Sequence, residues 1–85
     1  MLKLRINQNL WCEVDVRKDD CNREAAHCHI TRNGERIAQV WLDPVCIESA
    51  RKLDRNEVNL VYDFVSDNRY DLKREYENNR MYGAE

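Results

Sequence analysis

Hydrophobic and polar residues alternate through the first part of the chain, and a period of two is typical of β-strands. Residues 2–6 alternate leucine and isoleucine with basic side chains and predict a first strand. Residues 10–17 carry leucine, cysteine and valine at even positions and predict a second strand, after a polar turn at 7–9. The charged run at 18–26 has no periodicity and predicts a solvated loop.

The dipeptide Asn33-Gly34 predicts a β-hairpin over residues 27–42, because both residue types tolerate the left-handed backbone of tight turns. A two-residue loop would set Cys28 opposite Gln39, whereas a three-residue loop would set Cys28 opposite Ala38. We favour the second pairing because it separates apolar from polar positions. Its core face consists of Cys28, Ile30, Ala38, Val40 and Leu42, and its opposite face of His27, His29, Thr31, Ile37, Gln39 and Trp41.

The second half of the chain changes from strand to helix spacing. After Asp43-Pro44, residues 45–47 predict a short edge strand, where proline is tolerated, and 48–53 a connector or a turn of helix. Asp54 and Glu57 have the spacing of a capping box, so we expect a helix from about residue 55. Apolar residues then recur every three or four positions and predict a sheet-facing stripe. These residues are Val58, Val61, Tyr62, Val65, Leu72 and Tyr76.

The polar residues at 66–68 interrupt this helical pattern. The sequence therefore allows one helix to about residue 80 or two helices that meet at the interruption. Strands come first and helix last, without a repeat or linker, so residues 1–85 are predicted to form a single α+β domain. We expect an antiparallel sheet of three to five strands, packed against a helix or helix pair at about 55–80.

The composition limits the partners that the domain is expected to have. The 85 residues carry a formal net charge of -2, which argues against nucleic acid as a partner. No apolar run resembles an export signal or a membrane span, so we expect a cytoplasmic protein with reduced cysteines and no membrane partner. Basic and tyrosine residues at 69–82 could hold single-stranded nucleic acid, but the acidic residues among them favour a solvated helix face.

His27 and His29 are the candidate catalytic pair, because alternation along a strand points both imidazoles to the same side. In the favoured pairing Gln39 lies across from His27, and Trp41 shares the face. The two imidazoles could serve as general base and acid, with Arg36 or an arginine of the helix steadying a phosphate, as in a small ribonuclease. The alternative is that both rings pack on Trp41 as part of the fold.

The cysteines do not predict a metal site or a disulfide framework. No C-x-x-C pair is present, and the two histidines alone supply only two ligands. Cys12, Cys28 and Cys46 occupy apolar strand positions, where a thiol behaves as a small hydrophobic group. Cys21 lies in the polar loop without a candidate base beside it. Phosphate-loop and dinucleotide signatures are missing too, so no cofactor is expected.

The stretch HCHITRNGERIAQVWLDPV and the later segment NEVNLVYDFVSDNRYDLKREY resemble a family of small bacterial domains of unknown function. Members carry a Pro-Pro-His-x-His strand, a glycine turn, an Ala-x-hydrophobic strand and a helix in which Asn or His precedes Leu and an aromatic residue. The matching positions are His27, His29, Gly34, Ala38, Leu42, Asn68, Leu72 and Tyr76, with Ala25-Ala26 in place of the prolines. The resemblance implies a bacterial protein, sometimes encoded beside toxin–antitoxin-like partners, without implying a reaction.

Since no catalytic set is complete, we predict a non-enzymatic protein-interaction or regulatory module. It would act through the histidine-bearing sheet face and the adjoining helix, with Gln39, Trp41 and Arg36 as binding residues. Two alternatives stay open: the ribonuclease described above, and an oligomer-forming module that associates through a sheet edge or through its tryptophans.

Overall fold

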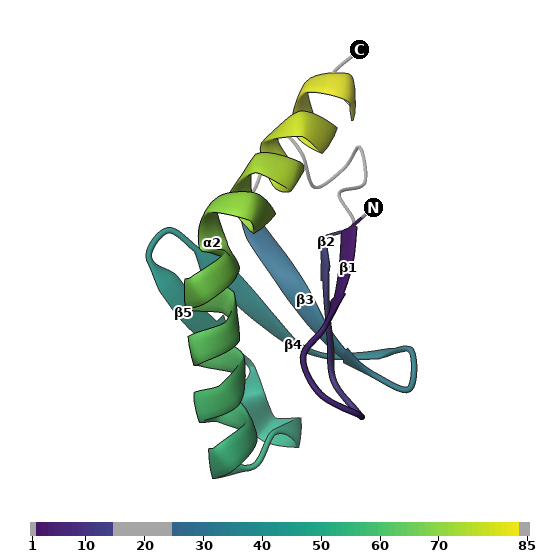
Figure 1. Ribbon diagram of the computed structural model, residues 1–85, viewed down its shortest axis with the longest axis vertical. Helices are drawn as coiled ribbons and strands as arrows, with labels where there is room; N and C mark the ends of the chain where they lie inside the picture. The colour runs from purple at the N-terminus through teal and green to yellow at the C-terminus, as the bar shows by residue number, and fades with distance from the viewer. Residues whose placement is uncertain (1, 15–24, 84–85) are drawn as a thin grey trace.

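The elements follow one another as an antiparallel meander and a closing helix (Figure 1). The computed structural model describes residues 2–14 and 25–83, with side chains as far as residue 78. The strands are β1 (Leu2–Arg5), β2 (Trp11–Val14), β3 (His27–Arg32), β4 (Glu35–Leu42) and β5 (Val45–Glu48), followed by the 3-10 turn η1 (Ala50–Lys52) and the helix α2 (Arg55–Gly83). The sheet order is β1-β2-β3-β4-β5, so the predicted α+β fold is confirmed.

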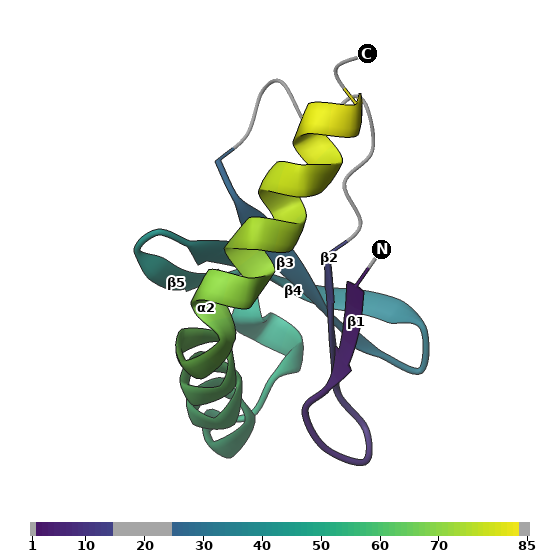
Figure 2. The ribbon, with the colours of Figure 1, turned by 45° about the horizontal axis from the view of Figure 1, so that its top comes forward.

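The helix α2 crosses one face of the sheet diagonally, and its last turns extend beyond the strands (Figure 2). It contacts β2, β3, β4 and β5. No helix within the described ranges is long and apolar enough to cross a membrane.

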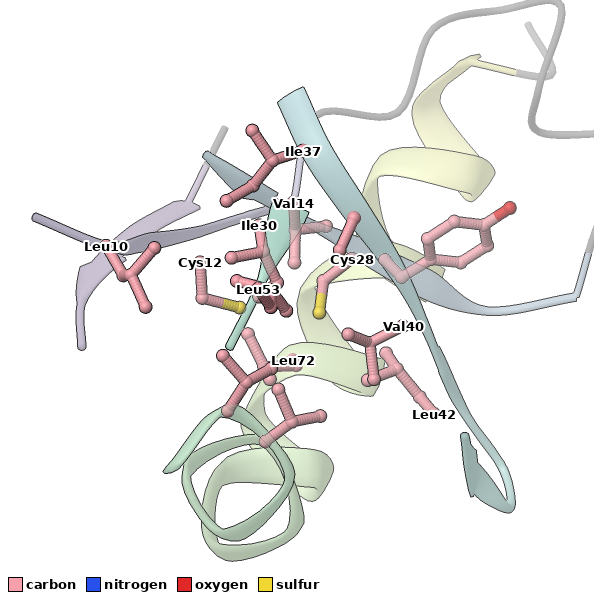
Figure 3. Packing of buried hydrophobic residues seen from close by; sticks show 14 residues of the cluster. Leu10, Cys12, Val14, Cys28, Ile30, Ile37, Val40, Leu42, Leu53 and Leu72 are labelled. Carbon is pink, nitrogen blue, oxygen red and sulfur yellow. The ribbon is translucent and has the colours of Figure 1, made fainter. Parts of the chain in front are cut away.

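The core lies between α2 and the alternate strand positions that face it (Figure 3). Every second residue of β2 is buried, and the buried residues of α2 recur at helical spacing. Each element therefore presents one apolar surface to the other. The side chains that are at most 2% exposed are Leu10, Cys12, Val14, Cys28, Ile30, Val40, Leu42, Val61, Val65, Leu72 and Tyr76. This set contains four of the five residues predicted for the hairpin's core face, and the fifth, Ala38, is also buried at 6% exposure.

The hairpin turn is tighter than predicted and is followed by a β-bulge. Asn33 and Gly34 have φ values of 54° and 80°, so they form a two-residue turn that pairs Arg32 with Glu35. The register then shifts, and Ile30 pairs with Ala38. The predicted pairing of Cys28 with Ala38 is therefore wrong, because the bulge adds one residue on β4.

The bulge has two further consequences for the hairpin. Cys28 pairs with Val40, so even-numbered residues still share the core face, as the sequence pattern predicts. Ile37, which was predicted on the opposite face, is 7% exposed and belongs to the buried cluster. The bulge lets both Ile37 and Ala38 join the core cluster, whereas consecutive side chains of a regular strand point to opposite faces.

The start of α2 has the predicted capping box. The backbone N–H of Glu57 donates to Oδ1 of Asp54 at 2.8 Å, and the backbone N–H of Asp54 donates to Oε1 of Glu57 at 3.0 Å. Each side chain thus satisfies a backbone donor that the first helical turn leaves without a partner. The helix begins at Arg55, as the spacing predicts.

The helix continues through the polar interruption at 66–68, so the two-helix alternative is wrong. Asn68 donates from Nδ2 to the carbonyl oxygen of Phe64 at 2.8 Å, which satisfies the amide within the helix. The predicted edge strand at 45–47 is confirmed as β5. The second strand ends at Val14 within the described residues, and most of the predicted loop at 18–26 lies outside them.

Candidate functional site

The face of the sheet opposite α2 carries a row of polar side chains that crosses all five strands. Strand pairing aligns Lys3 with Glu13, Glu13 with His29, His29 with Gln39, and Gln39 with Glu48. Residues at paired positions share a sheet face, so this row sets a cation, a carboxylate, an imidazole, an amide and a second carboxylate along one line. We call the surface around this row the polar face, and it has two neighbouring rows. One is Arg5, Trp11, Thr31 and Arg36, and the other is His27, Trp41 and Cys46.

Trp11 lies on the polar face beneath two cations from β1. Nζ of Lys3 lies 4.9 Å from the centre of the indole ring, and Cζ of Arg5 lies 5.6 Å from it. Both distances are within the range of cation–π attraction. The half-buried indole is therefore held in a positively charged setting at the β1 side of the sheet.

Trp41 occupies the other side of the polar face and is fixed by a hydrogen bond. Its Nε1 donates to Oε2 of Glu48 on the neighbouring strand β5, at 3.0 Å. The bond satisfies the polar atom of an amphipathic ring and fixes its orientation. Two tryptophans thus mark the polar face, one beside cations and one beside a carboxylate.

His27 is buried in a cluster of rings rather than presented on the surface. It is 5% exposed, and its ring centre lies 5.1 Å from that of His29, 5.5 Å from that of Trp41 and 5.2 Å from that of Tyr76. Its Nδ1 lies 2.9 Å from the carbonyl oxygen of Ala25, within hydrogen-bond distance. The ring thus links the polar face to the helix.

The structure brings most of the predicted site residues together, in a different arrangement. His29 is half-buried and pairs with Gln39, whereas His27 pairs with Trp41. The prediction that Gln39 lies across from His27 is therefore wrong, for the same reason as the hairpin register. Arg36 pairs with Thr31 near the turn, in the row of Trp11, and so lies apart from His27.

Thr31 was not singled out by the sequence as a site residue, yet it is unusual. It is 3% exposed, and its Oγ1 has no hydrogen-bond partner among the described residues. Burying a hydroxyl without a partner is unfavourable. No sequence signal marks this position, because threonine is a common strand residue.

The cysteines differ in their surroundings. Cys12 and Cys28 are buried side by side in the core, where a hydrogen bond with Cys12 and burial raise the pKa of the Cys28 thiol far above its ordinary value. A thiol held protonated is a poor nucleophile. Cys46, predicted at an apolar position, is exposed on the edge strand β5, so that prediction is wrong. Cys21 lies outside the described residues.

A groove of about 430 Å³ lies between the turn that joins β4 to β5 and the middle of α2. The peptide bond between Asp43 and Pro44 in this turn is cis. Four residues of α2 that line the groove follow one another at intervals of four, three and four positions, and this spacing is the sequence signal for one side of a helix. The groove is lined by Leu42, Asp43, Pro44, Val45, Tyr62, Ser66, Arg69, Tyr70 and Lys73.

The groove contains two polar contacts that set its electrostatics. Nζ of Lys73 donates to Oδ2 of Asp43 at 3.0 Å, and this contact raises the pKa of Lys73. Arg69 donates to the hydroxyl oxygen of Tyr70 at 3.3 Å, which lowers the pKa of Tyr70. Tyr62, predicted in the sheet-facing stripe, is 47% exposed and lines the groove instead.

Comparison with known protein families identifies the family of the chain and shows which elements the family shares. A family model described as "Domain of unknown function (DUF4160)" matches residues 17–77, which is more than half of the chain. The chain belongs to the DUF4160 family. The matched segment of this DUF4160 protein contains β3, β4, β5, η1 and most of α2, and therefore the whole groove. The strands β1 and β2, with Lys3, Arg5 and Trp11, precede it.

No curated protein and no solved structure matches the chain.

Proposed function

We propose that this DUF4160 protein is a non-enzymatic binding module that docks another protein on its polar face. The observation that carries the proposal is the pair of half-buried tryptophans on the sheet face opposite α2, each fixed by polar neighbours. Tryptophan and arginine are over-represented among residues that dominate the energy of protein interfaces. A rigid indole also loses little conformational entropy when a partner packs on it.

The charges of the polar face describe the partner that would fit it. Lys3, Arg5 and Arg36 lie in the direction of β1 and the hairpin turn, whereas Glu48 lies on β5. A partner with carboxylates beside an apolar side chain would meet the cations and Trp11 together. The opposite charge near Trp41 would fix its orientation, because mismatched charges oppose the reversed arrangement.

The burial of His27 favours this binding role over the ribonuclease alternative. General acid–base catalysis by two histidines requires both rings to reach the reacting atoms. His27 is 5% exposed among three rings, whereas His29 is half-buried on the polar face. We therefore assign His27 to support of the site, and we assign contact with the partner to His29, Gln39 and Trp41.

The setting of this interaction is also a proposal. The family resemblance suggests a bacterial cytoplasmic protein that regulates the product of a neighbouring gene, as in toxin–antitoxin-like pairs. A second copy of the chain is the competing occupant. Sedimentation that reports a monomer at the highest attainable concentration would remove that competitor.

Site-specific photocrosslinking in cells tests the proposal. A photoreactive phenylalanine at Gln39 is expected to give one discrete adduct with another protein, whereas the same residue at Asp63, exposed on α2, gives none. The partner identified in the adduct is then purified. Replacing both Trp11 and Trp41 by Ala is expected to weaken its binding at least tenfold.

Two results would contradict the proposed function. The first is equal labelling from Gln39 and Asp63, which would indicate nonspecific collisions. The second is cleavage of RNA by the purified protein that disappears in a His29→Ala variant prepared identically. The second result would favour the ribonuclease.

A further inference from the structure

The groove beside α2 has the composition of a ligand site, and it is separate from the polar face. Four residues of its helical wall, Tyr62, Ser66, Arg69 and Lys73, follow one another at intervals of four, three and four positions. Such residues lie on one side of a helix. Three of them come directly after the core residues Val61, Val65 and Leu72, so the stripe runs along the margin of the helix–sheet contact.

The opposite wall is the turn between β4 and β5, which lies beside the middle of α2 (Figure 1). Leu42 and Val45 pair across this turn and give it an apolar base. The volume of about 430 Å³ falls within the roughly 300–1,000 Å³ of small-molecule pockets. A nucleotide-sized molecule therefore has room between the turn and the helix.

Exposed aromatic rings are concentrated at this groove. Among the described residues, the large hydrophobic side chains that are exposed are Leu60, Tyr62 and Tyr70, and both tyrosines line the groove. Tyr70 is 70% exposed, and Cζ of Arg69 lies 4.9 Å from the centre of its ring. Tyrosine rings and guanidinium planes are the surfaces on which unpaired nucleobases stack.

Two cations lie beside these rings, one helical turn apart. Arg69 and Lys73 could each donate hydrogen bonds to a phosphate, and charge-assisted bonds of this kind are strong. The carboxylate of Asp43 now accepts from Lys73, but the two side chains are 73% and 39% exposed. Exposed ion pairs contribute little to stability, so a phosphate with a larger charge can displace Asp43.

We propose that the groove binds a nucleobase together with an attached phosphate. The base stacks on Tyr62 or Tyr70, and the phosphate accepts hydrogen bonds from Arg69 and Lys73. The sequence alone favours a solvated helix face here, because acidic residues alternate with the basic ones. The fold changes this balance because it gathers Arg69, Lys73 and the tyrosines on one wall, with Asp43 as the single carboxylate among the lining residues. This site depends on none of the residues of the polar face.

Titration of the isotope-labelled full chain with adenosine monophosphate, followed by NMR, tests the proposal. Amide shifts are expected at Leu42, Asp43 and Val45 and at residues 62–73, and not on β1 or β2. Arg69→Gln and Lys73→Gln should each weaken binding at least fivefold. Arg74→Gln is the matched control, because Arg74 is an exposed cation on the same helix that does not line the groove.

Asp43→Asn supplies a prediction of opposite sign. Removing the carboxylate that competes for Lys73 should tighten binding of the nucleotide two- to fivefold. A groove that instead selects cations through Asp43 would lose affinity in this variant. Weaker nucleotide binding by Asp43→Asn would therefore overturn the proposal.

Further ligands test the base and the phosphate separately, and they distinguish a free nucleotide from a nucleic acid as the ligand. Adenosine and inorganic phosphate should each bind more weakly than the nucleotide, and phosphate that binds as tightly would overturn the role of the rings. Tyr70→Leu should weaken binding of the nucleotide and leave binding of inorganic phosphate unchanged. An eight-nucleotide single-stranded RNA that binds more tightly than the mononucleotide identifies nucleic acid as the source, and the reverse identifies a free nucleotide. Absence of shifts with every ligand at millimolar concentration would overturn the site.

Discussion

The guanidinium of Arg32 donates a hydrogen bond of 2.5 Å to the carboxylate of Glu57. Arg32 ends β3 at the hairpin turn, and Glu57 lies in the first turn of α2, 25 positions later. The other carboxylate oxygen of Glu57 accepts the backbone N–H of Asp54. One side chain thus caps the helix and connects its start to the sheet.

Glu57→Ala is expected to lower the free energy of unfolding by about 1–2 kcal/mol, because it removes a capping bond and an ion pair together. Glu57→Gln should cost less, since its amide oxygen can still accept the Asp54 N–H. Urea denaturation of the variants measures both values. Equal losses in the two variants would mean that charge, and not capping, accounts for the effect.

The coupling between Arg32 and Glu57 can be isolated by a double-mutant cycle. Arg32→Gln, Glu57→Gln and the double variant are expected to give a coupling of roughly 0.5–1 kcal/mol, because the two side chains are only 32% and 20% exposed. The pair of Lys52 and Glu35 is the control, since both side chains are more than half exposed. A coupling no larger than that of the control would contradict the connecting role.

Thr31→Val is expected to stabilise the protein. The substitution keeps the shape of the side chain and replaces a buried hydroxyl that has no partner among the described residues. Removing such an unsatisfied group is expected to raise the free energy of unfolding by about 1 kcal/mol. The thermal midpoint of the variant measures the effect, and Thr31→Ser, which retains the hydroxyl, is the control. A destabilised valine variant would indicate that the hydroxyl contributes a hydrogen bond to the fold.

The buried thiol of Cys28 predicts a loss of stability at alkaline pH. The hydrogen bond with Cys12 and burial raise its pKa in the folded protein, whereas the unfolded thiol titrates near pH 8.5. Below that pH both states hold the proton, and the preference for the folded state is fully present. Above it only the unfolded state releases the proton, so the free energy of unfolding falls by about 1.4 kcal/mol for each pH unit.

Urea denaturation between pH 7.5 and 10.5 measures this slope. Cys28→Ala is the matched variant, and the slope, rather than the absolute stability, is the quantity to compare. The parent should lose stability more steeply than the variant above about pH 8.5–9. Parallel curves would mean that Cys28 titrates normally in the folded protein.

The sequence predicts this fold well where local patterns decide the structure. The capping box of Asp54 and Glu57 and the strand spacing around Cys28 each depend on residues a few positions apart. The bulge at Ile37 could not be read in the same way, because it follows from how β3 and β4 pack together. Since Asn33-Gly34 is compatible with either loop length, the local sequence does not determine the register of β3 and β4.

The candidate site was predictable in its composition and not in its exposure. Alternation correctly placed the rings of His27 and His29 next to each other. Tyr76, which lies about fifty positions later, packs against His27, and no local pattern reports that contact. The groove was missed because its walls, Asp43 and Lys73 among them, come from two elements that the fold brings together.

Replacing each histidine alone should affect stability and partner binding differently. His27→Ala removes a buried ring that lies close to three other rings, and the cavity is expected to cost about 2 kcal/mol. For a domain of this size that loss lowers the thermal midpoint by roughly 8–16 °C. His29→Ala removes a half-buried ring and should lower the midpoint by less than half as much. In the crosslinking experiment at Gln39, however, His29→Ala should reduce the yield of the adduct, because His29 pairs directly with Gln39. If instead His29→Ala destabilises the fold as strongly as His27→Ala, both rings belong to the scaffold, and the binding role passes to the tryptophans.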